Sequence, residues 1–202
     1  MVNSAIQITE KPDWVSWDEI HEALMRAHAF NREHGIIMRK PSLPGDEIRQ
    51  ELGKDGRMFV ALSDNHVVGT AAIISKKSKT WYTHAPYGYM CFASVLPEYN
   101  GKGIYKRLCD KRECIAKEMG LTGLYIDTHN KNTHVISISL KNGFKRVAVK
   151  GCKDHWNVVM FKWINGCPYS DSRCKIEFYK SKIITLLKAN TISFLRKLKV
   201  HK

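Results

Sequence analysis

The sequence predicts a protein of the α/β or α+β class, built on a sheet with a strand–helix–strand unit at its centre. Short apolar runs alternate along the chain with longer segments of helical periodicity, which indicates a mixture of strands and helices. A glycine-containing loop joins one predicted strand to a helix, and that helix leads directly into another strand. Because strand–helix–strand segments favour a parallel crossover, we expect two central strands to run parallel.

The N-terminal third is predicted to contain two helices and a hairpin. Residues 14–34 show helical spacing of apolar side chains and begin near a candidate cap, Ser16. A short second helix is expected at 46–52, after a proline-rich break. The apolar runs 57–62 and 66–75 lie on either side of a turn and predict the two strands of a hairpin.

The following 90 or so residues are predicted to contain the strand–helix–strand unit. In chain order we expect a strand at 87–96, a helix at 104–119, a strand at 124–128, a helix at 132–142, and strands at 144–149 and 156–163. In the first of these helices, Leu108, Ile115 and Met119 are expected to face inward, and Gly120 is placed to end the helix.

The C-terminal segment differs in composition from the rest. Residues 171–202 read as a basic amphipathic helix, with a potential break near Asn190. Apolar side chains recur there at three- to four-residue steps, at Ile176, Tyr179, Ile183, Leu187, Phe194 and Leu198. We therefore expect a domain at residues 1–165 and a helical extension at residues 166–202.

Charge and cysteine content narrow the class of protein. The formal net charge is +14, and residues 164–202 alone contain nine Lys/Arg and two Asp/Glu, a net +7. Such a charge suits an anionic partner or a phosphorylated ligand.

No run approaches the ~20 apolar residues of a membrane-spanning helix, and no signal peptide is recognisable. Six scattered cysteines without zinc spacing predict free thiols and no metal site, so we expect a cytoplasmic protein.

The segment Asn100-Gly101-Lys102-Gly103-Ile104-Tyr105 has the character of an anion site. The first amides of a helix have no partner within the helix, the helix dipole is positive there, and glycines let the backbone approach phosphate oxygens. Lys102 adds positive charge. A Gly-x-Gly segment by itself is weak evidence for such a site, and the alternative is an ordinary tight strand-to-helix turn.

This loop resembles the acetyl-CoA loop of the GNAT N-acetyltransferase superfamily, whose pattern is (Gln/Arg)-x-x-Gly-x-(Gly/Ala). A second match follows, since the family has a helix that begins near an asparagine and ends in Gly-Phe, here Asn132 and Gly143-Phe144. The resemblance spans roughly residues 6–163. It implies a GNAT-type mixed, largely antiparallel twisted sheet, with a central parallel βαβ splay and flanking helices. The C-terminal helical extension lies outside the resemblance and is expected in addition to this fold.

The resemblance also implies a co-substrate, acetyl-CoA or another acyl-CoA. Its pyrophosphate would lie on the loop, and its pantetheine arm would bond Val95 and Asn132. The cofactor-binding residues expected from the resemblance are thus Val95, Asn100, Gly101, Lys102, Gly103, Ile104, Tyr105 and Asn132.

Three positions depart from the family pattern. Asn100 replaces the usual Arg or Gln, and Tyr105 replaces a small residue, which is tolerated only if its side chain points away from the phosphates. Ser139 stands where the family often has a tyrosine that protonates the departing thiolate. Ser139 is therefore either a candidate acid or a helical residue that faces water.

An alkylammonium acceptor must lose a proton before it can attack a thioester. His129 ends the predicted central strand and is the candidate for this role, with a surface loop histidine as the alternative. Cys91 is a candidate nucleophile or, more simply, a core residue.

The resemblance implies direct transfer of an acyl group to an amine, in a small molecule or a peptide. The acceptor is expected over the first helix, the loop 35–44 and the strand ends. One alternative is a GNAT-like protein that binds acyl-CoA with little turnover and docks elsewhere through its basic tail. Another is a nucleic-acid or membrane-surface module, of which nucleic acid is the less favoured. The tail could instead cover the body or a second subunit of a homodimer.

Overall fold

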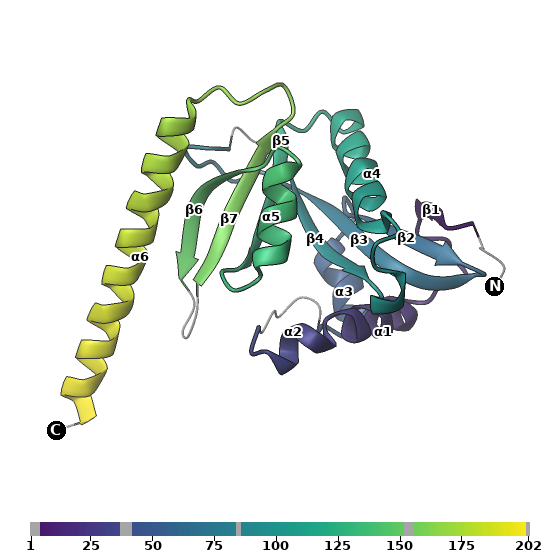
Figure 1. The fold of residues 1–202 in the computed structure, drawn as a ribbon, viewed down its shortest axis with the longest axis horizontal. Helices are drawn as coiled ribbons and strands as arrows, with labels where there is room; N and C mark the ends of the chain where they lie inside the picture. The colour runs from purple at the N-terminus through teal and green to yellow at the C-terminus, as the bar shows by residue number, and fades with distance from the viewer. Residues whose placement is uncertain (1–4, 37–41, 84–85, 152–155, 201–202) are drawn as a thin grey trace. The chain divides into compact units, whose positions relative to one another are not determined.

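The computed structural model describes residues 5–36, 42–83, 86–151 and 156–200, of which 189–200 are described as backbone only. The chain forms two compact units, Met1–Leu124 and Tyr125–Lys202. Figure 1 shows the helices and strands of both.

The first unit is a four-stranded antiparallel sheet, in the order β1-β2-β3-β4, with helices on both faces. α1 and α3 pack on one face, and α4 packs on the other (Figure 1). The elements in chain order are β1 (Gln7–Glu10), α1 (Trp17–Ala27), α2 (Ala29–Glu33), α3 (Gly45–Leu52), β2 (Arg57–Ser63), β3 (His66–Lys76), β4 (Tyr87–Val95), the 3-10 helix η2 (Pro97–Tyr99) and α4 (Ile104–Glu118).

The main hydrophobic core of this unit lies between α1, α3 and the sheet. Ile20, Leu24 and Ile48 are fully buried there against apolar side chains of β2 and β3. The start of α1 is fixed by a capping box: Ser16 Oγ accepts from the Glu19 N–H at 3.1 Å, and Glu19 Oε2 accepts from the Ser16 N–H at 2.7 Å. The apolar stripe and the cap together explain the position of α1.

β5 (Gly123–His129) leads into the second unit, whose strand order is β5-β7-β6. The remaining elements are α5 (Thr133–Lys141), β6 (Lys145–Gly151), β7 (Trp156–Trp163) and α6 (Asp171–Val200). β6 and β7 pair antiparallel, and α6 packs along β6 (Figure 1). Ser181 Oγ accepts from the Val149 N–H at 2.9 Å and donates to the Val149 carbonyl at 3.2 Å, so α6 covers polar groups of an edge strand.

The predicted α/β class with mostly antiparallel strands is confirmed, but several details of the prediction are wrong. The single helix expected at 14–34 is two helices separated at His28. β1 was not predicted, because four residues are too few to show periodicity. The expected break near Asn190 is absent from the backbone of α6, since one asparagine costs a helix less than about 1 kcal/mol.

The inward face of α4 also differs from the prediction. Ile115 and Met119 are only half-buried, and the buried positions recur every four residues, at Ile104, Leu108, Arg112 and Ala116. An arginine thus occupies a core position, although arginine side chains are mostly exposed in proteins.

Within the described residues, no helix is long and apolar enough to cross a membrane, and no group of three or more His, Cys, Asp or Glu could hold a metal ion. The described cysteines are free thiols, as predicted, at Cys91, Cys109, Cys114, Cys167 and Cys174. Cys152 lies outside the described residues.

Candidate functional site

The loop before α4 is shaped by two glycines in the left-handed conformation. Gly101 has φ 78° and Gly103 has φ 72°. A Cβ added at either residue would meet no atom within 4 Å. Glycine is therefore favoured at both positions by the positive φ and not by a lack of space for a side chain. Gly103 is the N-cap of α4 and provides no side-chain cap. The first amides of α4 are therefore open to an acceptor from outside the helix.

The charge around this loop favours an anion. The first turn of α4 has no acidic residue. Lys102 is exposed, with its Nζ 4.6 Å from the ring centroid of Tyr99. Two neighbouring cations are already engaged, since Lys106 pairs with Asp110 at 2.6 Å and Arg107 donates to the carbonyl of Ile6 at 3.0 Å. Lys102 and the helix dipole remain as positive groups for a ligand.

The segment between β4 and the loop is braced from both ends. Val95 is the last residue of β4, is half-buried and pairs with Gly69 of β3. The Asn100 N–H donates to the carbonyl of Pro97 at 3.1 Å. Arg26 on α1 donates to Glu98 Oε1 at 2.8 Å across 72 residues of sequence, which ties the loop to α1.

Tyr105 is half-buried within a polar cluster on α4. Burial, followed by the neighbouring Cys109, raises the pKa of Tyr105 to about 12, while Arg112 acts in the opposite direction. Arg112 is 1% exposed and donates to the carbonyl of Ala72 at 3.5 Å and to Cys109 Sγ at 3.2 Å. The phenol thus contacts buried groups of α4, which agrees with the expectation that it points away from the open helix end.

β4 contains a bulge that the sequence did not predict. The register shifts between Thr70 and Ala72 of β3, where β4 has one extra residue. At the bulge, Phe92 has φ 50°, a conformation that costs a residue other than glycine about 1–3 kcal/mol. The run 87–95 reads as an uninterrupted strand, so no signal in the sequence marks this position.

Two side chains hold the backbone of the bulge. Thr70 is fully buried, and its Oγ1 donates to the Phe92 carbonyl at 2.8 Å. His28, between α1 and α2, is 3.1 Å from the Ala93 carbonyl through Nε2. Because a carbonyl only accepts, Nε2 carries the proton, and Nδ1 can accept from Asn31 Nδ2 at 3.0 Å. Burial lowers the pKa of His28, and its bond to the Ala93 carbonyl opposes this only in part, so the net lowering of the pKa favours a neutral histidine.

In the second unit, Asn132 forms the turn between β5 and α5. It is 8% exposed and is the N-cap of α5, with Oδ1 accepting from the Val135 N–H at 3.5 Å. Its Nδ2 donates to Thr128 Oγ1 at 3.1 Å. α5 ends before Gly143, which has φ 86°. The predicted start and end of this helix are confirmed.

His129 and Ser139 are both buried, with 2% and 4% of their surfaces exposed. His129 ends β5, and its Nδ1 accepts from the Lys131 N–H at 3.0 Å, so the neutral ring carries its proton on Nε2. The alternative of a surface histidine is therefore wrong. Ser139 lies with Ile136 on the buried side of α5, so the alternative that it faces water is also wrong.

The structure places the predicted residues in two local groups. Val95 and residues 100–105 lie at the start of α4 in the first unit, whereas His129, Asn132 and Ser139 lie at the ends of β5 and on α5 in the second. Cys91 is buried in the hydrophobic core, which favours packing over a nucleophilic role. Of the predicted acceptor loop, residues 37–41 lie outside the described residues.

Comparison with known proteins agrees with the resemblance to the GNAT family found in the sequence. The family model described as "Acetyltransferase (GNAT) family" matches residues 17–144. A GNAT-family acetyltransferase from Staphylococcus aureus Mu50 is similar in structure, with a TM-score of 0.62 and 22% identity over 79% of this chain and 99% of that one. No curated protein matches the sequence.

Two further similar structures contain a ligand. The PaiA N-acetyltransferase of Thermoplasma acidophilum, in complex with coenzyme A, has a TM-score of 0.58 and 21% identity over 79% of this chain and 99% of that one. A GNAT-family acetyltransferase from Elizabethkingia anophelis with acetyl-CoA bound has a TM-score of 0.57 and 15% identity, covering 78% and 97%.

Proposed function

Because the chain belongs to the GNAT acetyltransferase family, we propose that it transfers an acyl group from acetyl-CoA or another acyl-CoA to an amine. The observation that carries this proposal is the open N-terminus of α4, where two left-handed glycines precede a first turn without acidic residues. The coenzyme A and acetyl-CoA in two similar structures support the same cofactor.

The residues of the loop fit a pyrophosphate. The backbone of residues 101–105 offers amide donors, and Lys102 offers a cation that no described carboxylate neutralises. In the second unit, Asn132 uses one Nδ2 hydrogen for Thr128, and we assign the other to the pantetheine arm. In the first unit, we assign the backbone of Val95 to the same arm.

In the proposed reaction the amine nitrogen forms a bond to the thioester carbon, the carbon–sulfur bond breaks, and coenzyme A leaves as the thiol with a proton that derives from the amine. The chain mainly orients the reactants and stabilises developing charge. We assign the backbone N–H that polarises the thioester carbonyl to the β4 bulge. The carbonyls of this bulge accept hydrogen bonds from Thr70 and His28. A bulge re-aims backbone groups without loss of the flanking strand.

The proton-transfer roles proposed for His129 and Ser139 differ in how well the geometry supports them. The Nδ1 lone pair of His129 is engaged by the Lys131 N–H, so Nε2 holds the proton and is no base in this tautomer. We assign His129 to positioning the turn that contains Asn132, whose N–H donates to the His129 carbonyl at 2.9 Å. Ser139 stays the proposed acid, acting through water because its side chain is short.

A coenzyme A titration tests the cofactor half of the proposal. We expect calorimetric binding by the full chain and roughly tenfold weaker binding by Lys102→Ala, as for loss of one contact to a charged group. Lys117→Ala is the matched control, since Lys117 lies at the other end of α4 and pairs with Glu113 at 3.4 Å. Absence of binding, or equal losses in the two variants, would count against the assigned phosphate site.

A second candidate function is acyl-CoA binding with little turnover, and the observation that favours it is Ser139. A buried serine is a poor acid compared with the tyrosine common at this position in the family. Tight coenzyme A binding without thiol release from any amine would support this candidate over the enzyme.

We also propose that the acyltransferase domain spans residues 1–165 and that residues 166–202 form a separate functional extension. The acceptor in this proposal is a small-molecule or peptide amine.

A further inference from the structure

One side of α6 packs against other elements of the second unit. Cys174 and Phe178 are 3% and 8% exposed. Further along the same side, Ser181 and Thr185 bond the backbone of Val149 in β6. These four positions recur at three- to four-residue steps and define the inner face of α6.

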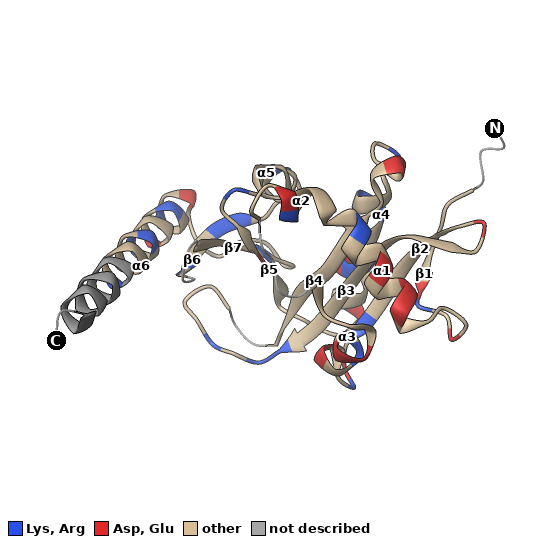
Figure 2. Ribbon diagram, turned by 90° about the horizontal axis from the view of Figure 1, so that it is seen from below, with Lys and Arg blue, Asp and Glu red and all other residues tan. Residues whose placement is uncertain are grey.

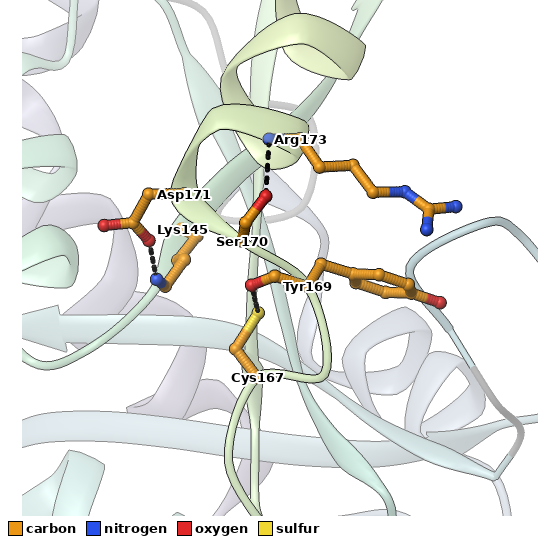
Figure 3. A network of polar contacts seen from close by, with 6 residues as sticks. All are labelled: Lys145, Cys167, Tyr169, Ser170, Asp171 and Arg173. Atoms are coloured by element: carbon orange, nitrogen blue, oxygen red, sulfur yellow. Dashed lines mark hydrogen bonds and ion pairs between the residues drawn. The ribbon is translucent and has the colours of Figure 1, made fainter.

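The start of α6 is anchored by a set of polar contacts, drawn in Figure 3. Lys145 of β6 forms an ion pair with Asp171, and Ser170 Oγ accepts from the Arg173 N–H at 3.2 Å. The Arg173 guanidinium lies 4.5 Å from the ring centroid of Tyr169. The inner face and this anchor fix which side of α6 faces away from β6.

The opposite side of α6, here named the outer face, is apolar and exposed. Ile176, Tyr179 and Ile183 are 54%, 59% and 58% exposed. At about 100° per residue they lie within about 60° of one another and roughly opposite the inner face. Ile184, Leu186 and Leu187 widen this surface and are 51%, 45% and 61% exposed. Packing on β6 accounts for the inner face and leaves these apolar side chains in contact with solvent.

Positive charge lies on both borders of the outer face and within it. Lys180 is exposed and lies about 40° from Ile176, between Leu187 and Ile184 around the helix. Lys175 and Lys188 are exposed and lie about 100–120° to either side of Ile176 around the helix. Residues 171–188 contain five Lys/Arg and two acids, and each acid is paired, Asp171 with Lys145 and Glu177 with Lys180. Figure 2 shows these basic positions along α6, with few acidic ones among them.

We propose that the outer face of α6 binds the surface of an anionic lipid membrane, with the helix axis along the headgroup layer. An exposed apolar stripe flanked by lysines is the pattern of an interfacial helix, in which the lysine stems reach up to the phosphates. Tyr179 suits the same boundary, because its ring is apolar and its hydroxyl polar. A second copy of the chain is a poorer occupant, since its outer face has the same positive border and would be repelled.

The test is co-sedimentation of the full chain with vesicles of equal parts phosphatidylcholine and phosphatidylglycerol, compared with phosphatidylcholine alone. Binding is expected only to the anionic vesicles and is expected to weaken as salt is raised. Ile176→Ser/Ile183→Ser should reduce the partition coefficient by about tenfold per residue. Lys175→Gln/Lys188→Gln should reduce it by roughly fivefold per lysine.

The control is Trp14→Ser, which removes an apolar side chain of similar exposure, 56%, in the first unit. It should leave the partition coefficient unchanged. All substituted side chains are exposed, and circular dichroism should confirm that each variant is folded. Equal binding to both kinds of vesicle, or no binding, would overturn the proposal. A dimer in sedimentation that Ile176→Ser/Ile183→Ser dissociates would also overturn the proposal. Binding to duplex DNA that this variant leaves intact would overturn it as well.

Discussion

Replacing Gly103 with alanine should weaken coenzyme A binding far more than its effect on stability implies. Gly103 has φ 72°, and an added Cβ would meet no atom within 4 Å. The cost to the folded state is therefore only that of a left-handed alanine, about 1–2 kcal/mol. Gly120 follows the C-terminal end of the same helix, with φ 64° and the same open surroundings, so Gly120→Ala should cost the same. Each variant should melt about 2–8 °C lower than the parent.

Binding should separate the two variants. Gly103 is the N-cap of α4, so relief of its strain turns the first amides of the helix away from their present directions. Loss of one hydrogen bond from these amides to a phosphate costs about 1.5–3 kcal/mol, which corresponds to roughly a ten- to hundredfold weaker Kd. Gly120→Ala leaves the first turn unchanged and should retain the parent Kd.

The assay is calorimetric titration of coenzyme A into the parent and both variants, with melting temperatures measured on the same samples. We expect equal losses in melting temperature and a Kd change confined to Gly103→Ala. Equal Kd values for the two variants, at comparable stability, would refute a phosphate site at the start of α4.

Three further perturbations test other parts of the structure. Thr70→Val should lower stability by about 1–3 kcal/mol in denaturant titration, because the buried Phe92 carbonyl loses its donor; an unchanged midpoint would contradict this. Burial lowers the pKa of His28 below 6.5, so the unfolded chain binds its proton first as the pH falls. The His28 contribution is thus complete above about pH 6.5 and is lost below it, and His28→Gln should flatten the stability profile in that range. Ser181→Ala should speed amide exchange at Val149, whose N–H it leaves without that acceptor, and unaltered exchange would argue against the edge contact.

The parts of the site that the sequence predicted are those determined by local backbone chemistry. Gly103 and Gly143 mark a helix start and a helix end because few other residues adopt positive φ at low cost. Asn132 caps α5 through its own side chain, a contact that spans only three residues. Such short-range requirements are visible in a single sequence.

The parts that were missed depend on contacts between distant segments. The bulge at Phe92 is held by Thr70, 22 residues earlier, and by His28, 65 residues from the Ala93 it contacts. Arg112 occupies a core position because Tyr105, Cys109 and the Ala72 carbonyl surround it, and no helical pattern predicts an arginine there. Propensity and periodicity contain no information on partners of this kind.

The same distinction applies to α6. Its amphipathic pattern was recognised in the sequence, but a single apolar stripe could not show whether it covers the chain or faces away. The structure resolves this for the described side chains, since Cys174 and Phe178 face β6 whereas Ile176 and Ile183 are exposed.

The most direct test of N-acyltransferase activity is a thiol-release assay with acetyl-CoA and a panel of amines, amino sugars, polyamines and peptides, with mass spectrometry of the acceptor. We expect that at least one class of amine gives thiol release with stoichiometric gain of one acetyl group on nitrogen. We also expect that Gly103→Ala lowers this rate at subsaturating acetyl-CoA, while Gly120→Ala does not. Coenzyme A binding without acetylation of any acceptor would contradict the assignment as an N-acyltransferase.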